Sequence, residues 1–147
     1  KGLFSIESSG ERLQQLMQST LAELKITPAA LNCIVAHANG NPKSDISEAR
    51  AIAEVARNES VPVTGFKWSM GHTLCASGVM DAVLATEMLQ QHTIPGLPYL
   101  NKLAAECDTL DVSQAHQPLN AQIKPYTLLL NRGFGSMNTT LVLKYCE

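Results

Sequence analysis

The sequence lacks the features that would assign it to several special classes of protein. Its charged residues make up 16% of the chain, sum to a formal net charge of −2 and form no block of one sign. That pattern gives no electrostatic reason to expect a nucleic acid or an anionic membrane as partner. Asp81, Glu87 or a glycine interrupts the longest apolar stretches before the roughly 20 residues that a membrane span needs, and no charged-then-apolar signal segment opens the chain. We therefore expect a cytoplasmic protein.

The four cysteines are widely spaced and include no Cys-x-x-Cys pair. This spacing favours neither a zinc site nor a disulfide framework, so we expect reduced thiols and no bound metal. A length of 147 residues with 45% hydrophobic content is enough for one domain with a sizeable core. The first residue is Lys1 rather than methionine, and no capping signal opens the chain. We expect residues 1–147 to be a single domain taken from a longer protein.

Hydrophobic periodicity predicts alternating helices and strands. Capping-box spacings, from Ser8 to Glu11 and from Asp45 to Glu48, mark the expected beginnings of the first two helices. A mixed sheet with right-handed crossovers is the simplest α/β arrangement of this order. The expected elements are a helix to about residue 25, a strand at 31–36, a helix ending near 57, a strand at 61–66, a helix at 73–90, an irregular stretch at 94–122 and a hairpin of strands at 126–130 and 139–144.

The segment 73–90 carries apolar side chains around almost its whole circumference. Such a helix is normally buried on all sides, and one small sheet cannot surround it. We infer that this helix lies between two layers, one of which is not encoded in this chain.

Two histidines occupy loops that follow short strands, where α/β enzymes place reactive groups. His37 follows the strand 31–36 and precedes an Asn-Gly-Asn-Pro turn, and its alternative role is a hydrogen bond to that turn. His72 lies in Gly-His-Thr at the expected start of the helix 73–90. The helix field there opposes protonation, and a neutral imidazole can donate one hydrogen bond to a developing oxyanion, as in the triosephosphate isomerase case.

Other residues near these loops have both a structural and a functional interpretation. Asp81 lies inside the apolar helix, where an unpaired carboxylate would be costly, and Lys67 is its natural partner. The Phe134 amide either belongs to a tight hairpin turn or serves as an oxyanion donor, with the ring gating access. Cys75 is more readily a small packed residue than a nucleophile. His92 and His116 lie in polar segments and are expected to be solvated.

Together these loops resemble the C-terminal half of a β-ketoacyl-acyl-carrier-protein synthase, a condensing enzyme of the thiolase-like fold. The family motif His-Gly-Thr-Gly-Thr-Pro-x-x-Asp-x-x-Glu is similar to His37–Glu48, with Ala38, Asn39 and Asn41 substituted. The family's Lys followed by Gly-His-Thr falls at Lys67 and 71–73, the acidic partner of that lysine falls at Asp81, and Gly-Phe-Gly-x-x-Asn falls at 133–138. The resemblance extends from about Glu11 to the C-terminus.

The resemblance implies an α/β thiolase-like half and a decarboxylative Claisen condensation of malonyl-carrier with an acyl thioester. It assigns stabilisation of the enolate to His37 and His72, ordering of the site to Lys67, and supporting roles to Asp81, Glu48 and Phe134. It further implies pantetheine contacts by Asn39, Asn41, Phe134 and Gly135. The implied partners are an acyl carrier protein, whose phosphopantetheine carries the substrate in place of a resident cofactor, and an N-terminal half whose cysteine is the nucleophile. The complete protein is expected to be a homodimer or heterodimer.

The sequence departs from the family pattern beside the gate, and two alternative functions stay open. Arg132 and Met137 replace an aromatic residue and a threonine beside the gate, which favours a divergent subgroup. One alternative is a non-catalytic partner subunit of the chain-length-factor kind, although such subunits commonly lose the histidines. Another is a free-standing binding module, which requires these 147 residues to form a stable monomer. The 147 residues by themselves are expected to be inactive, because the nucleophile is not among their cysteines.

Overall fold

A four-stranded mixed sheet forms the centre of the computed structural model, which describes residues 7–146. Its order is β2-β1-β5-β6. β1 (Leu31–Val35) runs parallel to both β2 (Val63–Thr64) and β5 (Tyr126–Gly133), and β6 (Met137–Lys144) returns antiparallel to β5. The mixed sheet and the C-terminal hairpin are therefore as expected, whereas the strand expected at 61–66 is reduced to two paired residues.

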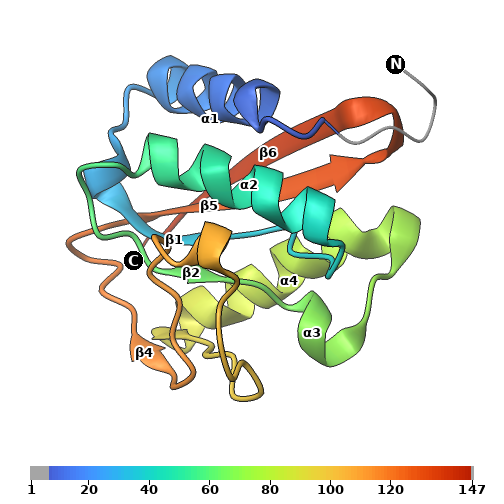
Figure 1. Cartoon of the computed structure of the whole chain (residues 1–147). Helices are drawn as coiled ribbons and strands as arrows, with labels where there is room; N and C mark the ends of the chain where they lie inside the picture. The colour runs from blue at the N-terminus through green and yellow to red at the C-terminus, as the bar shows by residue number, and fades with distance from the viewer. Residues whose placement is uncertain (1–6, 147) are drawn as a thin grey trace.

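Helices cover both faces of this sheet (Figure 1). α1 (Glu11–Leu24) and α2 (Pro42–Val55) lie on one face, and α4 (Ser77–Gln90) lies on the other. The alternation of side chains along each strand divides the core accordingly. Ile34 and Leu128 pack on the α1–α2 side, and their neighbours Val35 and Leu129 pack on the α4 side. Short helical turns complete the fold: η1 (Pro28–Ala30), α3 (Lys67–Met70), η2 (Leu74–Ala76), η3 (Ala105–Cys107) and η4 (Phe134–Ser136).

Both predicted capping boxes are wrong. α1 begins after Gly10, which has φ 86°, and the Glu7 carboxylate accepts the backbone N–H groups of Ser9 and Gly10. α2 begins four residues earlier than expected, because Asn41 rather than Asp45 caps it by accepting from the Lys43 and Ser44 amides. Asp45 and Glu48 therefore lie within the helix, which frees the Glu48 carboxylate for the loop after β1. α2 also ends at Val55, slightly before residue 57.

The helix expected at 73–90 is shorter and is buried on one side only. Positive φ angles at Gly71 (76°) and Leu74 (51°) interrupt the helical path, so that α4 begins at Ser77. Asp81, Ala85 and Met88 on one side of α4 are buried, whereas Val79 on the other side is 68% exposed. The chain thus supplies one of the two layers that the apolar composition of this helix predicts.

The stretch at 94–122 is more ordered than its sequence indicates. β3 (Thr93–Ile94) pairs antiparallel with β4 (Gln117–Pro118), and an isolated parallel bridge joins Pro62 to Asp111. Within residues 7–146, no helix has the length and apolar character needed to cross a membrane.

Candidate active site

The register of the three parallel strands brings three chain segments together at one edge of the sheet. Val35 of β1 is level with Thr64 of β2 and with Leu129 of β5. His37 lies two residues beyond Val35, and Asn131 lies two residues beyond Leu129. Lys67 follows β2 as the first residue of α3 rather than as the end of the strand. The carboxyl ends of these strands therefore place these side chains in one region, as is usual for α/β enzymes.

Glu48 holds the loop that carries His37. Its two carboxylate oxygens accept the backbone N–H groups of His37 (2.8 Å) and Ala38 (2.9 Å). Ala38 has φ 38°, which an alanine adopts only when its surroundings compensate the strain. Burial raises the pKa of Glu48 to about 7, against the opposing effects of these two amides and of Arg132. The loop conformation therefore depends on a carboxylate whose ionisation falls near neutral pH.

The two histidines form an edge-to-face pair. The ring centroids of His37 and His72 are 5.1 Å apart and the rings are inclined by 78°. Burial lowers the pKa of His37 to about 4, with further lowering by Lys67 and His72, while a hydrogen bond with the Asn131 side chain acts in the opposite direction. His37 is therefore a neutral imidazole at pH 7. Its Nδ1 is buried and has no hydrogen-bond partner in the structure.

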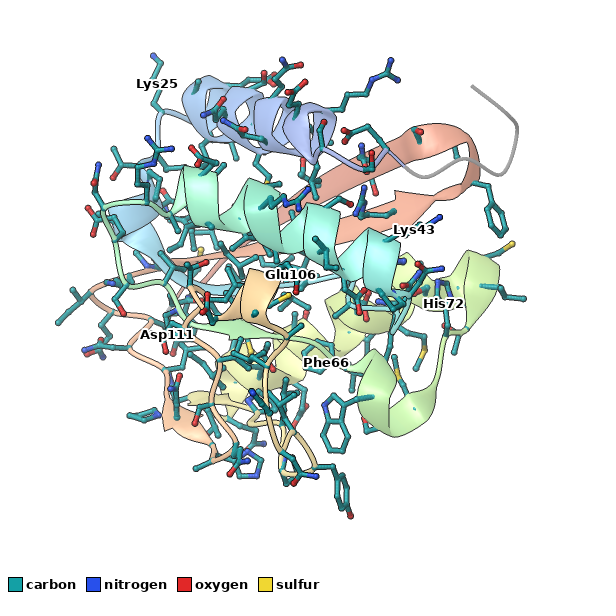
Figure 2. The ribbon with its side chains drawn as sticks, in the orientation of Figure 1. Lys25, Lys43, Phe66, His72, Glu106 and Asp111 are labelled. Atoms are coloured by element: carbon teal, nitrogen blue, oxygen red, sulfur yellow. The ribbon has the colours of Figure 1, made fainter. Side chains whose placement is uncertain are left out.

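The backbone of the next residues orients His72. The Leu74 N–H donates to Nδ1 of His72 at 2.9 Å, so the proton of the neutral ring lies on Nε2. His72 precedes the short turn η2 and not α4. The expected position at the N-terminus of the long helix is therefore wrong, and the Leu74 amide, rather than the field of that helix, determines the tautomer of His72. His72 is exposed in this chain, at the end of the molecule where α2 begins and which also carries Lys43 (Figure 2).

Lys67 and Asp81 form the predicted ion pair. Lys67 Nζ lies 2.5 Å from Asp81 Oδ2, and both side chains are almost completely buried. The Asn131 Nδ2 group donates to the same carboxylate oxygen at 3.2 Å. A buried ion pair requires such additional hydrogen bonds, and Asn131 supplies one.

Asn131 was not among the residues selected from the sequence. It precedes the glycine motif 133–138 and matches no catalytic pattern, and only the alignment of β5 with β1 places it beside His37. The parallel pairing of these strands was the missing signal. The segments 31–36 and 126–130 are both short apolar runs typical of buried neighbouring strands, and that pairing is the signal that points to Asn131.

The remaining predicted site residues lie around this cluster. Phe134 and Gly135 lie on the turn between β5 and β6, where the Phe134 side chain is 65% exposed and Gly135 has φ 71°. Asn41 uses its side-chain oxygen to cap α2, and Asn39 accepts the Asn41 N–H at 3.0 Å. The four cysteines are free thiols, and Cys75 is exposed in η2. Across the described part of the chain, no three His, Cys, Asp or Glu side chains gather where they could hold a metal ion.

Comparison with known proteins identifies the family. The family described as "Beta-ketoacyl synthase, C-terminal domain" matches residues 3–101. The chain belongs to this family.

Two curated relatives and one solved structure illustrate the range of similar proteins. The chain is 29% identical over 140 residues to a 3-oxoacyl-[acyl-carrier-protein] synthase 2 of Coxiella burnetii, covering 93% of this chain and 33% of that protein. It is 27% identical over 139 residues to the non-reducing polyketide synthase esdpA of Penicillium shearii, covering 90% of this chain and 6% of that protein. A chain in the structure of a ketosynthase in complex with its chain length factor, from Xenorhabdus doucetiae, matches with a TM-score of 0.82 and 25% identity, over 98% of this chain and 36% of that chain.

These similarities define the fold as one half of the thiolase-like architecture of ketosynthases. The chain spans about a third, or less, of the length of the curated relatives that it matches.

Proposed function

We propose that this chain is the histidine-bearing half of a β-ketoacyl-acyl-carrier-protein synthase. The observation that supports this most strongly is the pairing of the two imidazoles, 5.1 Å apart, beside the buried Lys67–Asp81 ion pair. Two imidazole N–H groups at this spacing can each donate one hydrogen bond to a single oxygen atom. An enolate oxygen is the kind of acceptor that preorganised donors stabilise.

The proposed reaction begins with a malonyl group held as a thioester on a carrier protein. The bond between its carboxylate and the adjacent carbon breaks, carbon dioxide leaves, and the electron pair forms an enolate whose oxygen accepts hydrogen bonds from His37 and His72. The enolate carbon then attacks the carbonyl carbon of an acyl group bound to a cysteine. A carbon–carbon bond forms, and the cysteine leaves as a thiolate.

The other predicted residues take supporting parts in this proposal. Lys67, held by Asp81, provides a fixed positive charge near the histidines, and Glu48 holds the loop of His37. Phe134 would gate access, and its amide would assist the acyl-transfer step. Asn39, Asn41, Phe134 and Gly135 would contact the pantetheine arm. Because Asn41 already uses its side-chain oxygen to cap α2, its amide N–H₂ is the group available to the arm.

The proposal requires partners. An acyl carrier protein would present the substrate on phosphopantetheine, and no other cofactor is needed. The nucleophilic cysteine would come from a second half that covers the exposed side of α4, and the complete protein would act as a homodimer or heterodimer. The name of the Coxiella relative includes the carrier protein, and the Xenorhabdus ketosynthase was solved with a partner subunit, which supports these partner types.

Decarboxylation of malonyl-carrier by the complete protein tests the proposal. His37→Ala and His72→Ala should each lower the rate by about 10²–10³-fold, the usual cost of removing one oxyanion donor. His92→Ala is the matched control, because His92 is exposed beyond the opposite end of α4 and should leave the rate unchanged. Wild-type rates of decarboxylation in His37→Ala and His72→Ala, as in His92→Ala, would refute the assignment.

A non-catalytic subunit of the chain-length-factor kind is the second candidate, since the Xenorhabdus complex contains such a subunit. In that case the histidine pair would be retained without a catalytic role, and substitution would change product length or dimer formation rather than decarboxylation. The residue at the nucleophile position of the second half separates the two: a cysteine favours the enzyme, and another residue favours the partner subunit.

A further inference from the structure

The Arg132 side chain joins several separate segments of the chain near the turn between β5 and β6. Its Nη1 donates to the Ser44 carbonyl oxygen at 2.7 Å and to Ser47 Oγ at 2.7 Å, both on α2. Its Nε donates to Asn138 Oδ1 on β6 at 3.1 Å, and its Nη2 donates to the Glu7 carbonyl oxygen at 3.3 Å. A guanidinium presents its N–H groups in a rigid fork, and protein acceptors occupy most of that fork.

One end of this set of contacts closes the gate turn, which we define as residues 134–136 between β5 and β6. Arg132 and Asn138 are cross-strand partners beside this turn, and their side chains are hydrogen-bonded to each other. Ser136 within the turn has φ 60°, which is unfavourable for residues other than glycine. The contact between Arg132 and Asn138 therefore supports a turn whose backbone conformation its surroundings must hold.

The other end of the contacts lies on the first turns of α2. Ser44 and Ser47 are almost completely buried. The Ser44 N–H donates at 3.4 Å to the Asn41 side chain that caps α2, while the Ser44 carbonyl accepts from Arg132. Ser44 thus connects Arg132 to the loop of Asn39 and Asn41. In the proposed function, both this loop and the gate turn contact the pantetheine arm.

A direct contact with the phosphate of that arm is the other role open to a guanidinium at this position. The Arg132 side chain is only partly exposed, and its Nε, Nη1 and Nη2 each already donate to a protein acceptor. A phosphate would have to displace these hydrogen bonds. The geometry therefore favours a link between protein segments over a contact with the ligand.

We propose that Arg132 is a positioning residue that fixes the gate turn relative to the first turn of α2, so that the two segments contacting the pantetheine arm keep a set separation. This inference rests on the proposed function, which assigns the arm to these segments. Segments that are already fixed bind the arm at a lower cost in conformational entropy. Arg132 departs from the family motif, which has an aromatic residue there, and an aromatic side chain has no comparable set of donors.

Hydrogen exchange in the complete protein tests the link itself. Arg132→Lys keeps the positive charge, but its donors lie on one nitrogen and cannot reproduce the fork. The amides of residues 131–140 should exchange about tenfold faster in this variant, the usual effect of losing a charge-assisted hydrogen bond. The far end of the same strand, residues 126–129, should exchange as in the wild type. Asn138→Ala removes the acceptor on β6 and should act in the same direction.

The kinetics of malonyl decarboxylation test the positioning role. Arg132→Lys should raise the KM for malonyl-carrier by about tenfold with kcat nearly unchanged, because it weakens binding of the arm and leaves the histidines in place. The malonyl thioester of ethanethiol lacks the arm, so its kcat/KM should be equal in variant and wild type. A general disturbance of the site would lower kcat/KM for both substrates. A direct charge contact with the phosphate would leave the KM of Arg132→Lys close to that of the wild type.

Arg57→Lys is the matched control. Arg57 is an exposed arginine beyond the opposite end of α2, where it pairs with Glu54. This variant should leave both the exchange of residues 131–140 and the KM for malonyl-carrier as in the wild type. Unchanged exchange in folded Arg132→Lys, or an unchanged KM for malonyl-carrier, would overturn the inference.

The inference and the proposed function fail in different experiments. If His37→Ala and His72→Ala abolish decarboxylation while Arg132→Lys changes neither exchange nor KM, the proposed function stands and the inference is wrong. If the histidine variants keep the wild-type rate, the proposed function is wrong, and hydrogen exchange alone then decides whether Arg132 links the gate turn to α2.

Discussion

At the scale of single residues, the Lys67–Asp81 pair shows how strongly the site depends on buried charge. Each side chain lies almost wholly out of water, and each is the main partner of the other. Asp81→Ala should therefore lower the free energy of unfolding by about 3–5 kcal/mol, because it leaves the Lys67 ammonium buried without its counterion. Urea unfolding of the complete protein measures this.

The double substitution Lys67→Met with Asp81→Leu is the control for this prediction. It removes both charges and retains apolar volume, so its stability should lie much closer to the wild type than that of Asp81→Ala. A cost below about 1 kcal/mol for Asp81→Ala would show that the pair is not buried in solution.

A second prediction concerns how Glu48 makes the free energy of unfolding depend on pH. Its pKa is raised from 4.5 to about 7, so between these values the folded state holds more protons than the unfolded state. The contribution of Glu48 to the free energy of unfolding should then fall by about 3 kcal/mol as pH rises from 4.5 to 7 and stay constant above. His37, with its pKa lowered from 6.5 to about 4, contributes in the opposite direction from pH 4 to 6.5.

Comparison with Glu48→Gln isolates the carboxylate from His37. The difference in unfolding free energy, wild type minus variant, should decrease from pH 4.5 to 7, because the glutamine does not titrate. His37→Gln is the complementary variant, and its difference should increase from pH 4 to 6.5. A wild-type to Glu48→Gln difference independent of pH would contradict the buried position of the carboxylate.

Sequence reasoning found most of the residue cluster because the chemistry is carried by short local patterns. His37, His72, Lys67 and Asp81 each have an uncommon position in a loop or an apolar helix. Asn131 has none, because its importance arises only from the pairing of strands far apart in the chain. Periodicity along one segment contains no information on such pairing.

At the scale of elements, α2 shows why the capping-box pattern predicts the wrong first residue of a helix. Asn41, Asp45 and Glu48 are all compatible with a cap, and the structure selects Asn41 because Pro42 fits the first helical turn. Glu48 is drawn instead to the amides of the loop after β1. The capping-box rule considers only contacts within the helix, and here a tertiary contact prevails.

Substitution at the cap checks this assignment. Asn41→Ala should lower the free energy of unfolding by about 1 kcal/mol, because two amides lose their acceptor, and Asn41→Asp should retain most of the stability. Helix content by circular dichroism and thermal unfolding measure both. If Asn41→Ala had no effect while Asp45→Ala destabilised the helix, the beginning of α2 at Asn41 would be wrong.

At the scale of the whole molecule, the most unusual part of the surface is the apolar side of α4 that is exposed to solvent. Val79 and Val83 of α4 are 68% and 58% exposed, and Leu74 of the preceding turn η2 is 74% exposed. Large apolar patches of this kind on a surface are typical of interaction sites. The apolar circumference of this helix predicts a second layer at this position, and that layer stays a prediction.

The 147-residue chain on its own should therefore self-associate through this face. Val79→Lys with Val83→Lys should reduce the association, measured by sedimentation velocity over a range of concentrations, and should reduce binding of a hydrophobic dye. Leu24→Lys is the control, because Leu24 is an exposed leucine on α1, on the opposite face of the sheet. Equal effects of the two sets of substitutions would show that association does not depend on α4.

The position of β5 between β1 and β6 has a consequence for synthesis on the ribosome. β1 is complete by Val35, yet its neighbour on one side is made only when Tyr126–Gly133 has been translated. Until then one edge of β1 lacks its strand, and the segment between them emerges with part of its apolar core uncovered. Among residues 7–146, the pairing that brings Asn131 to His37 is thus one of the last contacts to become available during synthesis.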